Sequence, residues 1–544
     1  MQKRVIIIPA IKKNAVIPDQ LIKKLAGITL MERALNTARA VTSGENIIVL
    51  TDSQEISLLC ERAGVGFRYN KDFHVGGLDI VHALRHVLEE VAQNFENLLI
   101  YRPSCPLLTW VDIDDAWHNF AESDADSLVT VKSVRQRIWE HNNGTLDALL
   151  DDDSGTLLYM ESKALIILKS TALLSGHIDR TIPYFLNDRA LEINSYQDWW
   201  ICERLLMRRH VVFVVAGYPA IGMGHIYRAL MLAHEISEHR ITFMCTRKSE
   251  LAVTSITARD HKTVMQHGED LAAEVLSLKP DLVINDMLNT ERDYMHSLKT
   301  AGIRVVNFED EGPGALLADY VINALYEEKV HDERFCYGPR YFCLRDEFAG
   351  AARNVFRPEV RTVLVTFGGT DNTDFTRRTL DVIEPLCRTR GIHIRVVAGP
   401  GYVHSEALAT HIAQLNNPLV EFTNTTNVMS RMMEGADLAV CSAGRTVYEL
   451  AHMRVPALVV AHHQREAQHS FARAHNGFAY LGIMSKISDT KLRNVFERML
   501  EAENRQRLFD RQNRFTFSRN KNHVIRIMLE LLDSDHTDNN EAVS

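Results

Sequence analysis

The chain has 544 residues, 46% of them hydrophobic and 24% charged, so it is several times the usual size of a domain and can bury more than one core. Its formal net charge of -9 at pH 7 excludes a general attraction to nucleic acid or to an anionic membrane, so a phosphate ligand would need a local site. The eight cysteines form no Cys-x-x-Cys pair and no zinc-finger spacing, a pattern typical of free thiols in a reducing cytosol.

The first third of the chain alternates short β-branched runs with segments of helical period. The runs fall at residues 5–8, 47–50, 98–101 and 127–131. The first of them is too short for a signal peptide or a membrane span, so we expect a cytoplasmic protein with no membrane-spanning segment. A helical segment at residues 199–206 then ends near Arg208.

The same rhythm continues to the C-terminal end. Strands are predicted at residues 211–215, 241–244, 282–284, 304–307, 320–322, 362–367, 393–397, 438–440 and 456–460. Strand-helix alternation of this kind predicts an α/β protein built of βαβ units with mainly parallel sheets. Breaks near Arg208 and between Ala351 and Pro358, with an acidic end, predict domains at residues 1–208, 209–355 and 356–535 and a polar tail at 536–544.

Several short motifs of the first domain occur in a characteristic order. They are Pro9-Ala10, Lys23-Lys24-Leu25-Ala26-Gly27, Arg102-Pro103-Ser104-Cys105-Pro106 and Leu191-Glu192-Ile193-Asn194. In this order they resemble the CMP-sialic acid synthetase (acylneuraminate cytidylyltransferase) family. The resemblance implies a nucleotidyltransferase-like Rossmann-type domain that couples CTP to a nine-carbon 2-keto acid and through which the chain forms a homo-oligomer.

The resemblance also implies particular binding residues. Those expected to bind the nucleotide are Ala10, Lys12, Lys13, Lys23, Arg102 and Ser104, and those expected to bind Mg²⁺ are Glu192 and Asn194. The chain departs from the family pattern, because Ile11 and Ala15 stand where the family has an arginine and a lysine, and Asn194 replaces a carboxylate. Mg²⁺ prefers anionic oxygens, so two interpretations stay open: an active cytidylyltransferase, or a non-catalytic nucleotide-binding module.

Three glycine-bearing turns follow strands in the remainder of the chain. They comprise residues 222–225, 367–372 and 441–445. Loops at the carboxyl ends of parallel strands meet in one crevice, so two facing lobes would aim these turns into a single cleft. The first turn places His225 at a helix N-terminus, where the positive end of the helix dipole favours an anion and disfavours imidazolium. This pattern predicts a neutral histidine base beside a nucleotide diphosphate.

These turns belong to a longer series of motifs that carries a second resemblance. Gly222-x-Gly224-His225-x-x-Arg228, residues 338–348, Phe367-Gly368-Gly369 and Ser442-Ala443-Gly444 followed by Glu449 resemble the hydrolase family of the pseudaminic acid pathway. That family removes UDP from UDP-2,4-diacetamido-2,4,6-trideoxy-altropyranose and has a two-lobed glycosyltransferase B fold related to that of MurG. The resemblance implies no cofactor for this half of the chain.

The second resemblance assigns a role to each matching residue. His225 would activate water, Ser442, Ala443 and Gly444 would hold the diphosphate, and Gly368, Gly369 and Thr370 would close over the nucleotide. Glu449 would accept the ribose hydroxyls. Gly222, Gly224, Arg228 and Asp286 would line the cleft, as would Asp310, and His463 and Gln464 would contact the sugar.

One departure concerns the sugar. The family pattern Glu-Asn-Gln reads His462-His463-Gln464 here, so the donors and acceptors that face the sugar differ. Together the two resemblances predict a bifunctional enzyme of nonulosonic acid biosynthesis that uses a UDP-sugar and CTP. A glycosyltransferase that uses a nucleotide sugar remains the alternative, and an apolar, basic face beside His225 would favour it.

Overall fold

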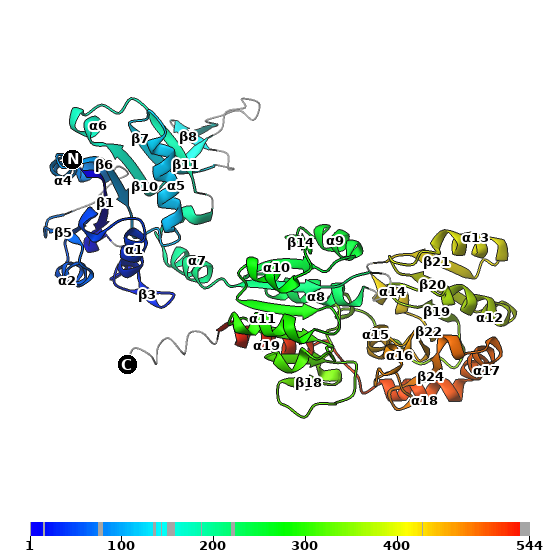
Figure 1. The fold of residues 1–544 in the computed structure, drawn as a ribbon. Coiled ribbons are helices and arrows are strands. Elements are labelled where there is room, and N and C mark those ends of the chain that lie inside the picture. Colours follow the sequence, from blue (N-terminus) through cyan, green and yellow to red (C-terminus); the bar gives the residue numbers. More distant parts are fainter. Residues whose placement is uncertain are drawn as a thin grey trace. The chain divides into compact units, whose positions relative to one another are not determined.

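The computed structural model describes residues 2–14, 17–73, 80–133, 138–142, 144–148, 158–186, 188–218, 223–426 and 428–533. The chain divides into two compact units, Met1–Arg208 and Arg209–Ser544 (Figure 1). Gly222, one of the residues expected in the cleft, lies outside the described residues.

The first unit is built on a mixed seven-stranded sheet. From edge to edge its strands are β11 (Thr181–Phe185), β7 (Ser127–Ser133), β10 (Tyr159–Lys169), β6 (Phe95–Tyr101), β1 (Gln2–Ala10), β4 (Ile47–Thr51) and β5 (Gly66–Tyr69). Strand β10 runs antiparallel to both of its neighbours, whereas the other pairs of the sheet are parallel. The unit also holds two separate two-stranded ribbons, β2 (Lys24–Leu25) with β3 (Ile28–Thr29) and β8 (Trp139–Asn142) with β9 (Thr145–Ala148).

Helices cover both faces of this sheet. They are α1 (Leu30–Arg39), α2 (Gln54–Ala63), α3 (Ile80–Ala83), α4 (Arg85–Ala92), α5 (Trp110–Ala121), α6 (Ser170–Ser175) and α7 (Tyr196–Leu206). One core packs α1, α2 and α5 on one side, and a second core packs α3, α4 and α6 on the other. Strand β1 contributes Ile6 and Ile8 to the first core and Val5 and Ile7 to the second, so its apolar run is buried on both faces.

The second unit holds two parallel sheets, one in each of two lobes. The N-lobe sheet has the order β14 (Thr263–Met265), β13 (Arg240–Cys245), β12 (His210–Val215), β15 (Leu282–Asp286), β16 (Arg304–Phe308), β17 (Tyr320–Asn323) and β18 (Phe335–Tyr337). Its helices are α8 (Gly224–Glu235), α9 (Glu250–Thr257), α10 (Leu271–Ser277) and α11 (Arg292–Thr300). The chain passes outward in both directions from β12, so the sheet is doubly wound and its crevice lies at the carboxyl end of that strand.

The C-lobe has the same architecture. Its sheet has the order β21 (Val420–Asn424), β20 (His393–Ala398), β19 (Thr362–Thr366), β22 (Leu438–Ser442), β23 (Ala457–Ala461) and β24 (Phe478–Ile483). Its helices are α12 (Phe375–Arg390), α13 (Ser405–Leu415), α14 (Met429–Met433), α15 (Thr446–Met453), α16 (Gln464–Ala467), α17 (Asp489–Leu500) and α18 (Ala502–Gln512). Two Rossmann-like lobes in sequence are the expected glycosyltransferase B arrangement.

The last helix corrects one expected boundary. The domain at residues 356–535 was expected to be the C-lobe, yet α19 (Lys521–Asp533) buries Val524, Ile527 and Met528 in the N-lobe core. Figure 1 shows this helix beside the N-lobe. The apolar side of α19 completes the face of the N-lobe sheet that α8 and α9 cover, so the chain returns to the first lobe after it finishes the second.

Two further features can be stated for the described residues. All eight cysteines are free and buried. No helix of the described part of the chain is long and apolar enough to cross a membrane.

Candidate functional site

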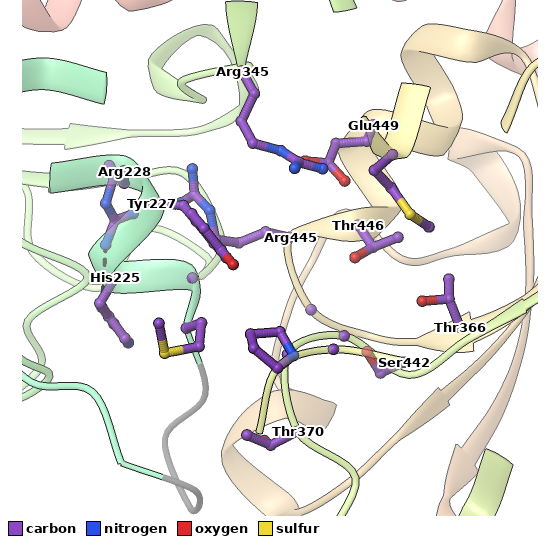
Figure 2. A pocket seen from close by; sticks show the side chains of 18 of the residues that line it. His225, Tyr227, Arg228, Arg345, Thr366, Thr370, Ser442, Arg445, Thr446 and Glu449 are labelled. Atoms are coloured by element: carbon purple, nitrogen blue, oxygen red, sulfur yellow. Dashed lines mark hydrogen bonds and ion pairs between the residues drawn. The ribbon is translucent and has the colours of Figure 1, made fainter. Parts of the chain in front are cut away.

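A cavity of about 980 Å³ lies in the second unit, between its two lobes. N-lobe residues that line it include Tyr218, Gly224, His225, Tyr227, Arg228 and Glu309, and C-lobe residues include Gly368, Gly369, Thr370, Ser442, Gly444, Arg445, Thr446 and Glu449. Figure 2 shows His225 and Arg228 across this cavity from Thr370, Ser442 and Thr446. The three glycine-bearing turns therefore reach one cleft, as far as the described residues extend.

His225 is held by a buried carboxylate. Its Nδ1 lies 2.6 Å from Oδ1 of Asp286, which is 0% exposed at the end of β15. Burial alone would raise the pKa of Asp286, but the charge and hydrogen bonds of Arg228, together with His225, hold that pKa well below its usual range. An ionised carboxylate only accepts, so Nδ1 donates its proton to Asp286 and Nε2 is left as a proton acceptor. Among the described residues, no hydrogen bond occupies Nε2.

Arg228 extends this pair into a buried charge cluster. One turn along α8 from His225, it donates from Nε to Oδ2 of Asp286 at 2.7 Å and from Nη2 to Oδ1 at 2.6 Å. It also donates to Glu309, which in turn accepts from Arg445 Nη1 at 3.2 Å. Burial opposes the charge of Glu309, but Arg228 and Arg445 outweigh it and lower the pKa of Glu309 to about 2. Two arginines thus balance two carboxylates beneath the cavity.

The opposite wall is a turn suited to an anion. Helix α15 begins without a side-chain cap: no side chain accepts from its first turn, in which the Val447 and Tyr448 N–H groups donate to the carbonyls of Gly444 and Arg445. Ser442, Gly444 and Thr446 line the cavity beside this turn. Gly368 has a φ of +82°, a left-handed conformation that favours glycine. A Cβ on Gly369 would lie 3.1 Å from the Met223 backbone, which brings this loop close to the start of α8.

Glu449 lines the cavity but is not free. Arg345 donates from Nε to its Oε1 at 2.8 Å and also pairs with Glu347 at 2.8 Å. The other carboxylate oxygen of Glu449 has no hydrogen bond among the described residues and remains available as an acceptor. The expected ribose-binding acid is thus a carboxylate oriented by an arginine from the segment that joins the lobes.

The segment at residues 462–464 lies at the cavity only in part. His462 and His463 line it, and His462 Nε2 lies 3.1 Å from the carbonyl oxygen of Phe367. His463 caps α16 by accepting from the Glu466 N–H, and burial, followed by the nearby His462 and Arg465, lowers the pKa of His463. Gln464 is the first residue of that helix and does not line the described cavity.

The remaining expected residues fall into two groups. Gly224, Arg228, Gly368, Gly369, Thr370, Ser442, Gly444, Glu449 and His463 line the cavity with His225. Three other expected residues do not line the cavity. Asp286 lies behind His225, and Ala443 is buried, with its carbonyl accepting from His469. Asp310 accepts hydrogen bonds from Thr290 and Asn307. From the sequence alone, no role was assigned to Arg445, Glu309 or Arg345. Arg445 ends the glycine-bearing turn at residues 441–445, and its positive charge beside that turn could have indicated a phosphate-binding role.

The lysines expected to bind nucleotide in the first unit are engaged internally. Lys12 pairs with Asp19 at 2.8 Å and with Glu55 at 2.7 Å, and Lys13 donates to the carbonyl of Lys71. Lys23 lies over the rings of Tyr196 and Trp199. Ala10 is buried at the end of β1. The positive charges of Lys12 and Lys23 therefore already have partners within the domain.

The expected Mg²⁺ ligands do not fit that ion as they stand. Glu192 pairs with Arg102 at 2.7 Å and accepts from the Ser104 hydroxyl at 3.3 Å, and the side-chain amide of Asn194 donates to the Glu192 carbonyl. A guanidinium already neutralises the only carboxylate of the pair, whereas Mg²⁺ requires free anionic oxygens. No group of three or more His, Cys, Asp or Glu residues in the described ranges is arranged to hold a metal ion.

Comparison with known families agrees with this architecture. Residues 5–212 match the family model Cytidylyltransferase, and residues 362–524 match the model Glycosyltransferase family 28 C-terminal domain. The first unit thus matches a cytidylyltransferase model, and the C-lobe of the second unit matches a glycosyltransferase 28 model. Both resemblances stated from the sequence are confirmed at this level.

Individual relatives point in the same direction. An uncharacterized protein of Methanocaldococcus jannaschii is 27% identical over 53% of this chain and 60% of its own length, so the match spans less than two thirds of that relative. The spore coat polysaccharide biosynthesis protein SpsG of Bacillus subtilis is 26% identical over 54% of this chain and 88% of its own. A Helicobacter pylori protein is 24% identical over 41% of each chain; it is named pseudaminic acid cytidylyltransferase and UDP-2,4-diacetamido-2,4,6-trideoxy-beta-L-altropyranose hydrolase.

Solved structures are similar at the level of individual parts. The match to MurG of Acinetobacter baumannii covers 59% of this chain and 99% of the MurG chain, with a TM-score of 0.44 and 15% sequence identity. A CMP:2-keto-3-deoxy-manno-octonic acid synthetase in complex with CTP covers 38% of this chain and 98% of its own, at a TM-score of 0.31 and 12% identity.

Proposed function

We propose that the second unit hydrolyses a UDP-diacetamido-trideoxy sugar to the free sugar and UDP. The observation that carries this proposal is the pair of His225 and buried Asp286, which leaves Nε2 open at a cavity whose far wall is the uncapped start of α15. The hydrolase activity in the name of the Helicobacter pylori relative supports the choice of sugar and of water as the acceptor.

The reaction follows from this geometry. Nε2 of His225 removes a proton from water as the water oxygen bonds to the anomeric carbon. The bond from that carbon to the β-phosphate oxygen breaks, and UDP leaves with the electron pair. Asp286 stabilises the imidazolium that forms, and the N–H groups at the start of α15 stabilise the charge on the leaving diphosphate.

The test is UDP release from candidate UDP-diacetamido sugars by the full chain. His225→Ala is expected to lower kcat by about 10²- to 10⁴-fold, the usual contribution of a positioned base. The matched control is His411→Ala, because His411 also lies 2.6 Å from a carboxylate, that of Asp381, but outside the cavity. A His225→Ala rate within a few-fold of the wild-type rate would overturn the assignment of the base.

A glycosyltransferase is the second candidate, and one observation favours it. Along α8 the cavity continues over Tyr227, Leu230 and Met231 to His234 near the other end of the helix, and Arg259 also lines it. This strip is apolar with a basic end, the feature that an acceptor with an anionic group would need. Product analysis separates the candidates: free reducing sugar supports hydrolysis, whereas sugar that appears only after an anionic acceptor is added supports transfer.

For the first unit we propose that it couples CTP to a nine-carbon 2-keto acid, a proposal that the cytidylyltransferase match supports. The internal pairs of Lys12 and Glu192 favour the alternative, a module without catalysis. Because the residues present do not fit Mg²⁺, the proposal involves no step through that ion. Release of pyrophosphate from CTP and the keto acid decides for activity, and its absence together with intact UDP-sugar hydrolysis decides for the module.

A further inference from the structure

Arg445 spans the two lobes from the position that precedes α15. Its Nη1 donates to Glu309 of the N-lobe at 3.2 Å and its Nη2 donates to the carbonyl of Cys343 at 3.2 Å. The guanidinium lies 4.8 Å from the ring centroid of Phe342. Its Cδ lies only 2.9 Å from the place where a Cβ of Gly224 would be, so the side chain passes directly over the start of α8.

This position puts Arg445 between the two halves of the proposed chemistry. Figure 2 shows it in the space between Arg228 on α8 and Thr446 on α15. On the N-lobe side, Glu309 joins Arg445 to Arg228, which holds Asp286 and thereby orients His225. On the C-lobe side, Arg445 is the residue before the uncapped helix, so its own backbone belongs to the anion-binding turn.

The side chain also retains donors for a ligand. A guanidinium has five N–H groups, and the two hydrogen bonds to Glu309 and Cys343 use two of them. Glu309 is shared with Arg228, so a single carboxylate serves two arginines. Arg445 lines the cavity with 18% of its side chain exposed, so the oxygens of an incoming diphosphate can accept from its remaining N–H groups.

We propose that Arg445 binds the β-phosphate of the nucleotide and stabilises its charge as the sugar leaves, an inference that rests on the hydrolysis proposed above. As the bond from the anomeric carbon to the β-phosphate oxygen breaks, the electron pair moves to that oxygen and Arg445 donates to it. The proton from water goes to His225. Arg445 therefore stabilises the charge of the leaving group, and Glu309 positions the Arg445 side chain.

The experiment measures binding of UDP and UMP to the full chain by isothermal titration calorimetry, without turnover. Arg445→Met is expected to weaken UDP by about 10- to 100-fold, the loss of a charged hydrogen bond, while UMP changes less than about threefold because it has no β-phosphate. Arg445→Lys keeps the charge and most of the volume, and is expected to retain part of the preference for UDP. Arg473→Met is the matched control, since Arg473 lies over Tyr480 and does not line the cavity.

Each outcome decides the question. Equal losses of UDP and UMP affinity in Arg445→Met would mean a structural role and overturn the inference, and so would unchanged UDP affinity. If Arg445→Met does not fold, Arg445→Lys decides: an altered ratio of UDP to UMP affinity supports the inference, and an unaltered ratio contradicts it. If the wild-type chain binds neither nucleotide, the proposed hydrolysis fails together with it.

Discussion

At the scale of single residues, the site depends on one spacing along a helix and one strand register. His225 and Arg228 are three positions apart on α8, so both point to the same side of the helix. Asp286 reaches them because β15 pairs with β12 in a register that sets Asp286 opposite Val215, at the edge from which the turn to α8 leaves. A carboxylate from the neighbouring strand thereby becomes the partner of the histidine.

Asp286→Asn is expected to lower kcat for UDP release by about 10²- to 10⁴-fold, because the imidazolium that forms loses its carboxylate. KM should change only a few-fold, since Asp286 does not line the cavity. Steady-state kinetics measure both values. The control is Asp310→Asn, because Asp310 is also a buried aspartate that follows a strand, but its partners are Thr290 and Asn307. If Asp310→Asn lost as much kcat as Asp286→Asn, the role given to Asp286 would be contradicted.

The charge cluster also predicts how stability depends on pH. The pKa of Glu309 falls from 4.5 to about 2 in the folded chain, because its two arginines outweigh burial. A lowered pKa means that the ionised group stabilises the fold above pH 4.5 and that this contribution is lost as the pH falls toward 2. The free energy of unfolding of the wild type should thus exceed that of Glu309→Gln at pH 6, by a margin that narrows at about pH 3.5. Urea titrations at both pH values measure the margin, and a constant margin would contradict the prediction.

The candidate site was predictable from sequence where its residues sit in short motifs. His225, Gly368 and Ser442 were all expected at the cleft, because a glycine turn after a strand directs its residues to the sheet edge. Arg345 was not expected to hold Glu449, since the two are 104 positions apart and only folding brings them together.

At the scale of elements, the two lobes meet where the start of α8 approaches the start of α15. Gly224 is the first residue of α8, and the side chain of Arg445 packs against it. A Cβ on Gly224 would lie only 2.9 Å from Arg445 Cδ, too close for a methyl group. The glycine therefore does more than loosen a turn. It allows an arginine of one lobe to reach a carboxylate of the other.

Gly224→Ala is expected to impair UDP release, because its Cβ would meet Arg445 Cδ at 2.9 Å and displace the guanidinium. The free energy of unfolding should stay the same or fall, because the displaced guanidinium loses its hydrogen bond to Glu309, and this loss offsets the better helix propensity of alanine, which is worth about 1 kcal/mol. Kinetics and thermal unfolding test this together. Gly350→Ala is the control, since a Cβ there meets nothing within 4 Å. A Gly224→Ala variant with wild-type kcat and UDP affinity would contradict the packing role of Gly224.

At the scale of the whole molecule, the first unit exposes apolar side chains on β8 to β11. Trp139 is 47% exposed, Leu146 61%, Tyr159 42%, Met160 48% and Phe185 52%. The Tyr159 and Phe185 rings are in edge contact, with centroids 5.1 Å apart. The Tyr159 and Phe185 rings therefore form one exposed apolar patch, and such patches mark interaction surfaces. A second copy of the chain is the partner we propose for this surface, in line with the expected homo-oligomer.

The full chain is therefore expected to sediment as a dimer or larger. The double variant Tyr159→Glu, Phe185→Glu is expected to sediment as a monomer, because two charges would be buried in the contact. Analytical ultracentrifugation at micromolar concentration measures this. Val403→Glu is the control, as Val403 is 70% exposed but belongs to the other unit. A monomeric wild-type chain, or a double variant that remains associated, would contradict the proposed contact.

The sequence by itself determined the α/β class, the strand–helix order and the position of His225, because hydrophobic period and glycine turns are local properties that the chain carries in any context. Only the tertiary structure decided the antiparallel insertion of β10, the return of α19 to the N-lobe and the partners of His225, Glu449 and Glu192. Those features depend on which distant segments pack together. A buried charged side chain pairs with the opposite charge that the fold brings close to it, and no local sequence pattern specifies which residue that is.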